Sequence, residues 1–293
     1  MIAEPAALSA SLDGLLDALA GQGLAARHST GPGGADEIIC GAATAADWPQ
    51  FRAALEAHLP PADVLIADHL PLVSGLFVSD MDSTMIGQEC IDELADFAGL
   101  KPQIAAITER AMQGELDFAA ALRERVALLA GLDEAAIARC LAERITPMPG
   151  ATTLVATLKA LGCHTVLVTG GFHQFADPVA AQLGFERVVA NRLEIASGKL
   201  TGQVTGAIVD SGVKRAVLEA EASRLGIGRA SGRSSLATGD GANDIPMLDA
   251  ACYGIAYHAK PKARAAAHGW IDRGDLTDVL RLLGIPDSEW TVR

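Results

Sequence analysis

Apolar residues in the first seventy positions recur at spacings that predict a small α+β module. Residues 8–19 and 48–59 carry apolar side chains at helical spacing, and two prolines follow the second segment. Short apolar runs typical of strands lie at four places, around residue 2 and at 24–28, 37–40 and 64–67. The order β-α-β-β-α-β is that of a ferredoxin-like fold. We therefore expect a ferredoxin-like module over residues 1–72, followed by a linker.

From residue 75 onward, buried strands alternate with helices. Strands are expected at 76–79, 165–168, 235–238, 253–256 and 270–271, with a hairpin at 192–206. Helical spacing occurs at 152–161, 172–183, 214–225 and 276–283. This alternation predicts a parallel, doubly wound, Rossmann-like α/β sheet within residues 73–293. In such sheets, ligands bind beyond the carboxyl ends of the strands.

Residues 88–145 contain no strand signal. Their apolar spacing predicts four helices, at 89–97, 103–112, 118–129 and 134–144. Because this block falls between the first two strands of the large domain, we interpret it as a helical insertion.

The amino-acid composition of the chain restricts which partners it is expected to bind and in which cellular compartment it is expected to lie. The formal net charge of the 293-residue chain is -13, and an acidic surface repels nucleic-acid phosphates. The five cysteines are scattered and never form a C-x-x-C pair, which favours reduced thiols. No apolar stretch approaches the ~20 residues that a membrane-spanning helix requires. We expect a soluble cytoplasmic protein with neither a nucleic-acid nor a membrane partner.

Carboxylates follow two of the predicted strands. Asp80 and Asp82 come directly after the strand at 76–79, and Asp240 and Asp244 follow the strand at 235–238. An isolated D-x-D is usually a solvated turn, but two acidic strand ends in one sheet bring like charges together. A hard divalent cation relieves that repulsion, and oxygen ligands favour Mg²⁺.

Two further elements lie between the acidic strand ends. Thr169, Gly170 and Gly171 follow a strand and precede a helix, where a hydroxyl and free backbone N–H groups form an anion cradle. Lys214 begins the next predicted helix. A lone lysine is most often a solvated surface residue, but here a phosphate site requires a cation.

These four elements, in this order, resemble the motifs of the haloacid dehalogenase-like (HAD) superfamily. The chain from about residue 76 to the C-terminus is further similar to the phosphoserine phosphatases. That resemblance rests on residues 80–84, 112–118, 122–126, 144–147, 170–172, 190–192, 198–202 and 239–244, together with Glu89. It implies that residues 88–147 form the family's helical cap.

The resemblance implies hydrolysis of O-phospho-L-serine, the small-molecule substrate, as the last step of serine biosynthesis. Asp80 would be the nucleophile and Asp82 the general acid and base. Mg²⁺ would be held by Asp80, the backbone carbonyl of Asp82 and Asp240. The implied substrate contacts are Glu89, Arg125, Thr169, Gly170, Lys214 and Asn243. Met112, Phe118 and Asp244 would have supporting roles, although Met112 and Phe118 are equally well explained as cap core.

Three alternatives stay open. The chain is also compatible with a HAD phosphatase for another small phosphomonoester, and with a phosphotransferase that passes the phosphoryl group to another alcohol. An ACT-like N-terminal module would add amino-acid binding. The sequence leaves the oligomeric state open, a homodimer included. Thr169 stands where the family more often has serine, so the hydroxyl is retained with an added methyl group.

Overall fold

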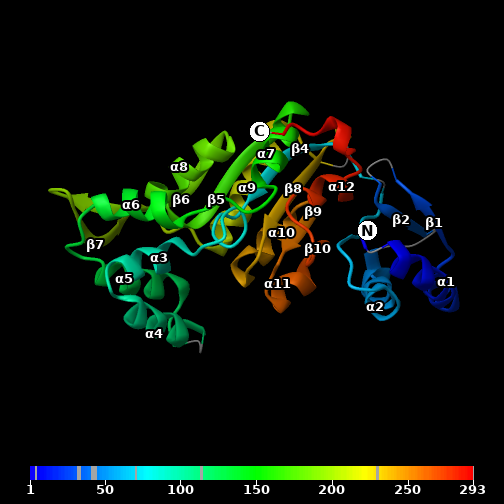
Figure 1. Cartoon of the computed structure of the whole chain (residues 1–293), viewed down its shortest axis with the longest axis horizontal. Coiled ribbons are helices and arrows are strands. Elements are labelled where there is room, and N and C mark those ends of the chain that lie inside the picture. Colours follow the sequence, from blue (N-terminus) through cyan, green and yellow to red (C-terminus); the bar gives the residue numbers. More distant parts are fainter. Residues whose placement is uncertain are drawn as a thin grey trace.

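The computed structural model describes residues 1–3, 5–31, 34–40, 45–69, 71–112, 115–228 and 231–292, without the side chains of 5–7, 45, 111 and 112. The N-terminal segment lies at one end of the molecule, a group of helices lies at the other, and a large sheet stands between them (Figure 1). Within these residues, no helix combines the length and the apolar character needed to cross a membrane.

The large sheet has eight strands and is mainly parallel. Their order is β3 (Val64–Leu65), β10 (Gly269–Ile271), β9 (Tyr253–Tyr257), β8 (Ser234–Gly239), β4 (Ser74–Ser79), β5 (His164–Phe172), β6 (Arg187–Ala196) and β7 (Lys199–Thr205). Only the edge strands β3 and β7 pair antiparallel to their neighbours. The predicted doubly wound α/β sheet is therefore confirmed.

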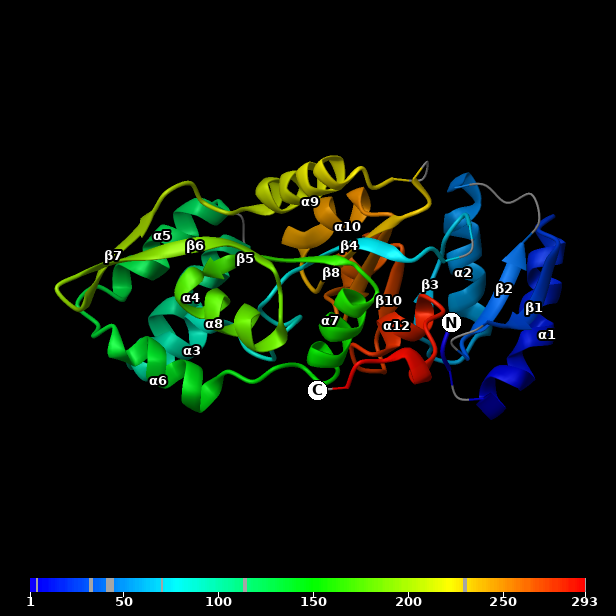
Figure 2. The same ribbon diagram turned by 90° about the horizontal axis from the view of Figure 1, so that it is seen from above.

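Helices cover both faces of this sheet (Figure 2). One face packs against α7 (Ala151–Ala160), α8 (His173–Leu183) and α12 (Asp278–Leu282), and the other against α9 (Ser211–Leu225) and α10 (Ile245–Ala250). Alternate residues of β4 point to opposite faces, so Phe77 joins one core cluster while Leu76 and Val78 join the other. Burial on both faces explains the uninterrupted apolar run at residues 76–78 of this strand. The short elements η3 (Ala242–Asp244), α11 (Pro261–Ala266) and η4 (Asp287–Glu289) complete this part of the chain.

The helical insertion consists of α3 (Cys90–Phe97), α4 (Lys101–Met112), α5 (Phe118–Leu128) and α6 (Ala135–Arg144), as predicted. Asp117 caps α5 by accepting a hydrogen bond from the Ala120 N–H at 2.7 Å. The β6–β7 hairpin extends to these helices, and backbone hydrogen bonds join residues 131–134 to residues 198–200. The insertion is thus tied to the sheet through its outermost hairpin.

The N-terminal segment differs from the ferredoxin-like prediction. It comprises α1 (Pro5–Gly21), β1 (Ala26–Thr30), β2 (Asp36–Cys40), η1 (Ala45–Asp47) and α2 (Trp48–His58). β1 and β2 form a two-stranded sheet, Ile2 makes only an isolated bridge to Asp63, and β3 joins the large sheet. The expected four-stranded sheet is therefore wrong, although a separate module over residues 1–72 stays a prediction.

Asp63 gives the physical reason why β3 belongs to the large sheet. Its buried carboxylate accepts hydrogen bonds from the backbone N–H groups of Asp272, Arg273 and Gly274 at 2.8, 3.0 and 2.9 Å. Val64 then packs in the same core cluster as Trp270. These contacts hold β3 beside β10.

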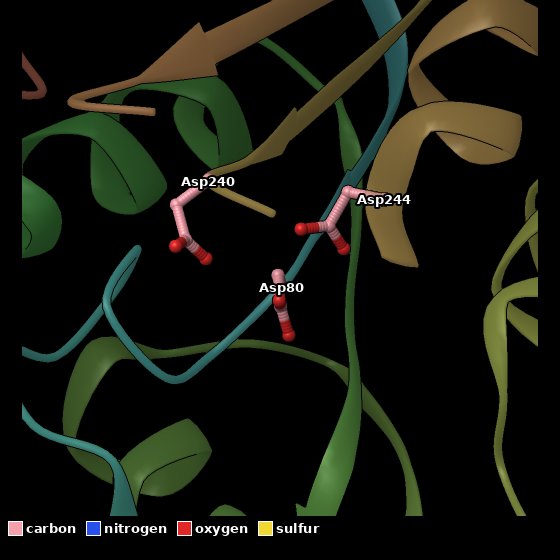
Figure 3. A group of neighbouring side chains, drawn as sticks. All are labelled: Asp80, Asp240 and Asp244. Atoms are coloured by element: carbon pink, nitrogen blue, oxygen red, sulfur yellow. The ribbon is translucent and has the colours of Figure 1, made fainter. Parts of the chain in front are cut away.

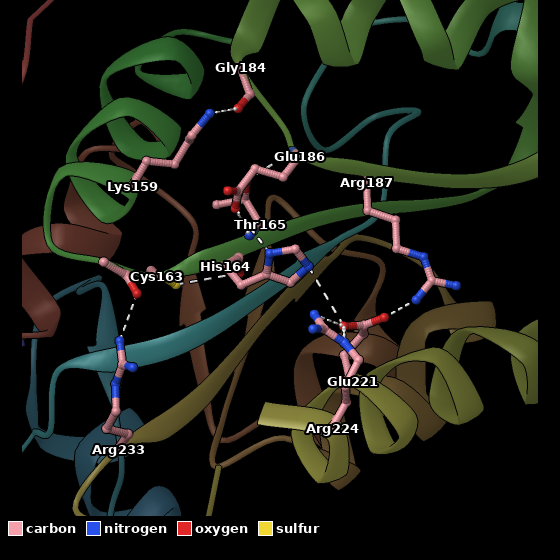
Figure 4. Close-up of polar contacts among 11 residues, drawn as sticks. Lys159, Cys163, His164, Thr165, Gly184, Glu186, Arg187, Glu221, Arg224 and Arg233 are labelled. Atoms are coloured by element: carbon pink, nitrogen blue, oxygen red, sulfur yellow. Dashed lines mark hydrogen bonds and ion pairs between the residues drawn. The ribbon is translucent and has the colours of Figure 1, made fainter. Parts of the chain in front are cut away.

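An ionic cluster fastens the amino ends of β5 and β6 to α9 (Figure 4). The buried carboxylate of Glu221 pairs with Arg187 and, at 2.6 Å, with Arg224. His164 lies 3.1 Å from Glu186 and 3.6 Å from Glu221. Lys214 lies in the first turn of α9. Because the pairs of Glu221 with Arg187 and His164 hold the C-terminal half of α9 against the sheet, they also restrict the position of that first turn.

Candidate active site

Asp80 lies where the central strand β4 ends, between β5 and β8. Its backbone N–H continues the sheet by donating to the Thr238 carbonyl at 3.0 Å. Its side chain is buried, and Oδ1 accepts a hydrogen bond from the Met81 N–H at 2.8 Å. The strand and this hydrogen bond fix the direction of the carboxylate.

Three buried carboxylates meet at this edge of the sheet (Figure 3). Asp80, Asp240 and Asp244 each offer an oxygen, and these atoms lie within 4.8 Å of one another. The buried ammonium group of Lys214 lies 2.7 Å from Oδ1 of Asp80 and 2.7 Å from Oδ1 of Asp244. The two acidic strand ends and the lysine predicted from sequence are thus brought together.

The glycine of the second acidic loop is required by close packing. A Cβ atom on Gly239 would lie only 2.5 Å from Cγ of Asp244, so any other residue would displace that carboxylate. The second oxygen of Asp244 accepts a hydrogen bond from the Gly241 N–H at 3.0 Å. The loop therefore holds Asp244 against Lys214.

The electrostatics of this cluster indicate a shortage of positive charge. Burial, and secondly the neighbouring Asp244, raise the pKa of Asp80 well above its usual range, although Lys214 opposes the shift. Burial also raises the pKa of Asp240, whose Oδ2 lies 3.5 Å from the exposed ammonium of Lys260. Burial alone would lower the pKa of Lys214, but Asp80 and Asp244 raise it, so the ammonium form is favoured. Oxygen donors that lack charge compensation fit a hard divalent metal ion.

Asp82 lies next to this cluster and faces the cradle. Burial, followed by the charge of Glu89, raises the pKa of Asp82 to about 7. Its Oδ1 is buried and has no hydrogen-bond partner among the described residues. A Cβ atom on Gly171 would lie 3.1 Å from its Oδ2, so the glycine admits the carboxylate at this position. A carboxyl group that titrates near neutral pH is suited to proton transfer.

Thr169, Gly170 and Gly171, the residues predicted to form an anion cradle, lie in the last part of β5. The buried hydroxyl oxygen of Thr169 accepts a hydrogen bond from the Gly171 N–H at 2.9 Å. The ring of Phe118, from the first turn of α5, lies so close that a Cβ atom on Gly170 would be 3.0 Å from its Cζ. The helical insertion therefore covers the cradle.

Two charged side chains of opposite sign, Glu89 and Arg125, lie on the side of the site that the helical insertion covers. Glu89 is open to solvent and accepts a hydrogen bond from the Ser83 hydroxyl at 2.9 Å. Arg125 is half-buried; burial lowers its pKa, while Asp92, Glu89 and Asp82 raise it. The guanidinium of Arg125 is therefore near enough to these carboxylates to interact with them electrostatically.

Of the remaining predicted residues, the structure describes the side chain of Asn243 but not that of Met112. Asn243 is exposed in η3, where its side-chain oxygen lies over Gly241. The side chain of Met112 lies outside the described part of the chain. Sequence reasoning missed Lys260, the exposed cation beside Asp240, because a lysine at a helix start is ordinarily solvated.

Comparisons with known proteins agree with this geometry. The haloacid dehalogenase-like hydrolase family matches residues 77–249. A phosphoserine phosphatase of Streptomyces coelicolor is 47% identical over 215 residues, covering 73% of this chain and 51% of that protein. A phosphoserine phosphatase of Idiomarina loihiensis is 46% identical over 210 residues, covering 72% of this chain and 94% of that protein.

A solved structure described as a phospho-aspartyl intermediate analogue of phosphoserine phosphatase has the same fold. Its TM-score is 0.65 at 38% identity, covering 71% of this chain and 98% of that one. This chain spans about half of the Streptomyces protein's length, 51%. The family match covers more than half of the 293 residues and includes both acidic strand ends. The chain therefore belongs to the haloacid dehalogenase-like hydrolase family.

Proposed function

We propose that this chain is a magnesium-dependent phosphoserine phosphatase that hydrolyses O-phospho-L-serine to L-serine and phosphate. The observation that carries the proposal is the buried carboxylate of Asp80, paired with Lys214 beneath a helical cap that bears Glu89 and Arg125. The Idiomarina relative, 94% of which this chain covers, supports the choice of substrate. A cytoplasmic location fits that role.

Asp80 acts as the nucleophile. Met81 and Lys214 both engage Oδ1, so Oδ2 is left to attack the phosphorus. A bond forms between Oδ2 and phosphorus while the bond to the serine oxygen breaks, giving an aspartyl-phosphate. Water then attacks the same phosphorus, phosphate leaves, and the Asp80 carboxylate is regenerated.

Asp82 moves the protons in both halves of this reaction. In the first half it gives a proton to the departing serine oxygen, and in the second it takes one from the attacking water. A pKa of about 7 allows both protonation states near neutral pH. Oδ1 of Asp82, which has no hydrogen-bond partner among the described residues, is the atom that we assign to these transfers.

Mg²⁺ would be held by Asp80, the backbone carbonyl of Asp82 and Asp240, with Asp244 beside them. When bound, it supplies positive charge that offsets the negative charge of the phosphoryl group. Lys214 adds a fixed positive charge beside Asp80 and Asp244. The chain's own contribution is thus to bury and orient the groups that must meet the phosphoryl oxygens.

The remaining predicted residues recognise the rest of the substrate. Thr169 and Gly170 donate hydrogen bonds to phosphoryl oxygens. The exposed Asn243 contacts the substrate where it enters the site. Glu89 binds the ammonium group of the substrate and Arg125 its carboxylate, the latter through a paired fork. Phe118 closes the apolar side over Gly170.

Phosphate release from a panel of phosphomonoesters tests this proposal. The purified chain should release phosphate from O-phospho-L-serine in the presence of Mg²⁺, and release should cease when a chelator is present. Adding alcohols such as glycerol or ethanol separates hydrolysis from phosphotransfer, because a transferase would form new phosphate esters. Faster turnover of another phosphomonoester, or turnover without any divalent ion, would reject the proposal.

A further inference from the structure

A buried amide side chain joins the two phosphate-binding elements of the site. Asn191, on β6, is 2% exposed and stands opposite Phe172 in the register with β5. Its Nδ2 donates to the Gly170 carbonyl at 2.8 Å, and its Oδ1 accepts from the Val209 N–H at 2.9 Å. Both ends of the amide are therefore satisfied by backbone groups on different elements.

The first of these hydrogen bonds determines how the Thr169 hydroxyl is presented. The peptide unit between Gly170 and Gly171 is held at both ends, its carbonyl by Asn191 and its N–H by Oγ1 of Thr169 at 2.9 Å. A hydroxyl oxygen that accepts a hydrogen bond still has its own proton to donate. The O–H of Thr169 is thereby directed away from Gly171 and is available to an anion in the cradle.

The second hydrogen bond fixes the segment that leads to Lys214. Val209 precedes Asp210, which caps α9 by accepting from the Val213 N–H at 2.9 Å. The backbone N–H of Lys214 donates to the Asp210 carbonyl at 3.1 Å in the same turn. Holding Val209 therefore holds the origin of the helical turn that carries the Lys214 ammonium.

We propose that Asn191 is a positioning residue that keeps the Thr169–Gly170 cradle and the Lys214 turn in register for the oxygens of one phosphoryl group. This inference rests on the proposed phosphatase function, because it assigns the cradle to phosphate. Asn191 touches neither the reacting atoms nor the acidic cluster. It acts on affinity for the phosphoryl group through Thr169 and Lys214.

Two substitutions separate the two hydrogen bonds. Asn191→Leu has a similar shape, adds no charge and removes both bonds. Asn191→Asp keeps an acceptor for Val209 but cannot donate to Gly170 when ionised. Gln174 provides a matched control, since its amide also bridges backbone groups of β6, donating to the Leu193 carbonyl at 2.8 Å and accepting from the Leu193 N–H at 3.2 Å. Gln174→Met and Gln174→Glu make comparable chemical changes at an amide that bonds to Leu193 instead of to Gly170 and Val209.

The affinity of each variant for inorganic phosphate, measured by calorimetry at saturating Mg²⁺, is the main readout. We expect Asn191→Leu and Asn191→Asp to weaken phosphate binding by about tenfold or more. Without its hydrogen bond to Asn191, the Gly170 carbonyl no longer fixes the orientation of the peptide unit between Gly170 and Gly171. Affinity for Mg²⁺ alone should change by a smaller factor than affinity for phosphate, since Asn191 contacts no carboxylate of the acidic cluster directly. The Gln174 variants should leave both affinities unchanged.

A double-mutant cycle with Thr169→Val tests the route of the effect. If part of the effect of Asn191 runs through the Thr169 hydroxyl, Asn191→Leu should weaken phosphate binding by a smaller factor in that background than in the wild-type chain. The inference fails if Asn191→Leu matches Gln174→Met, or if its full effect persists in Thr169→Val. Wild-type chain that binds phosphate but leaves O-phospho-L-serine intact would instead refute the proposed substrate, while the phosphate affinities would still decide the role of Asn191.

Discussion

The ammonium group of Lys214 lies 2.7 Å from Oδ1 of Asp80, with both side chains buried. The ammonium group of Lys214, on the helix α9, thus neutralises a carboxylate at the end of the strand β4. The pairing matters because two further carboxylates lie within reach, and one buried ammonium does not compensate three negative charges. This imbalance makes the site receptive to a metal ion, because a bound cation would offset the excess negative charge around Asp80.

Asp80→Asn should reduce phosphate release at least about 1,000-fold, because an amide oxygen is a poor nucleophile. The amide has nearly the same shape, so the fold should persist. Initial rates, together with circular dichroism to check folding, measure the effect. Near-wild-type turnover in a folded Asp80→Asn protein would remove Asp80 from the nucleophilic role.

Lys260→Met should tighten Mg²⁺ binding by about two- to fivefold, because the exposed ammonium 3.5 Å from Asp240 competes with an arriving cation. Calorimetric titration with MgCl₂ at low ionic strength measures this, and added salt should diminish the difference. Lys262→Met, which removes an exposed charge from the same helix α11, is the matched control. Equal Mg²⁺ affinity in the two variants would contradict the assigned competition.

Arg125→Ala should lower kcat/KM for O-phospho-L-serine about 100-fold or more, since a substrate carboxylate would lose its charged partner, a half-buried guanidinium. The same variant should change hydrolysis of p-nitrophenyl phosphate far less, because that ester has no carboxylate. Glu89→Gln should show the same selectivity through the substrate ammonium group. Equal losses on both substrates would take Arg125 and Glu89 out of substrate recognition.

Asp63→Ala should lower the free energy of unfolding by about 2–4 kcal/mol, because three backbone N–H groups lose a charged acceptor. Urea denaturation followed by fluorescence measures the loss. Asp13→Ala removes an exposed carboxylate from α1 and should change stability by less than about 0.5 kcal/mol. If the two variants are equally stable, Asp63 does not fasten β3 to the large sheet.

Much of the fold could be predicted because its signals are local. An uninterrupted apolar run at residues 76–78 reveals β4, which is buried on both faces, and the helices of the insertion differ from the predicted bounds by only a few residues. The strand β3 shows where local signals end. Its apolar residues predict a strand, but its partner β10 lies some two hundred residues away, and no local pattern specifies that pairing.

The residues of the site also divide into those that the sequence pattern predicts and those whose contacts depend on the folded chain. Asp80, Asp240 and Asp244 could be predicted to meet because they follow neighbouring parallel strands. Lys260 and Asn191 could not be assigned from the residues alone, since one is an exposed lysine and the other an asparagine within a strand. Their roles depend on contacts with Asp240 and with Gly170 and Val209, which only the folded chain creates.

The most direct test of the proposed function compares kcat/KM for three phosphomonoesters on the wild-type chain with Mg²⁺. O-Phospho-L-serine carries both charges, phosphoethanolamine lacks the carboxylate, and 3-(phosphonooxy)propanoate lacks the ammonium group. We predict that O-phospho-L-serine is preferred over each of the others by at least about 100-fold, because the missing group leaves Arg125 or Glu89 unpaired. Comparable kcat/KM values for all three esters would contradict recognition of phosphoserine by this site.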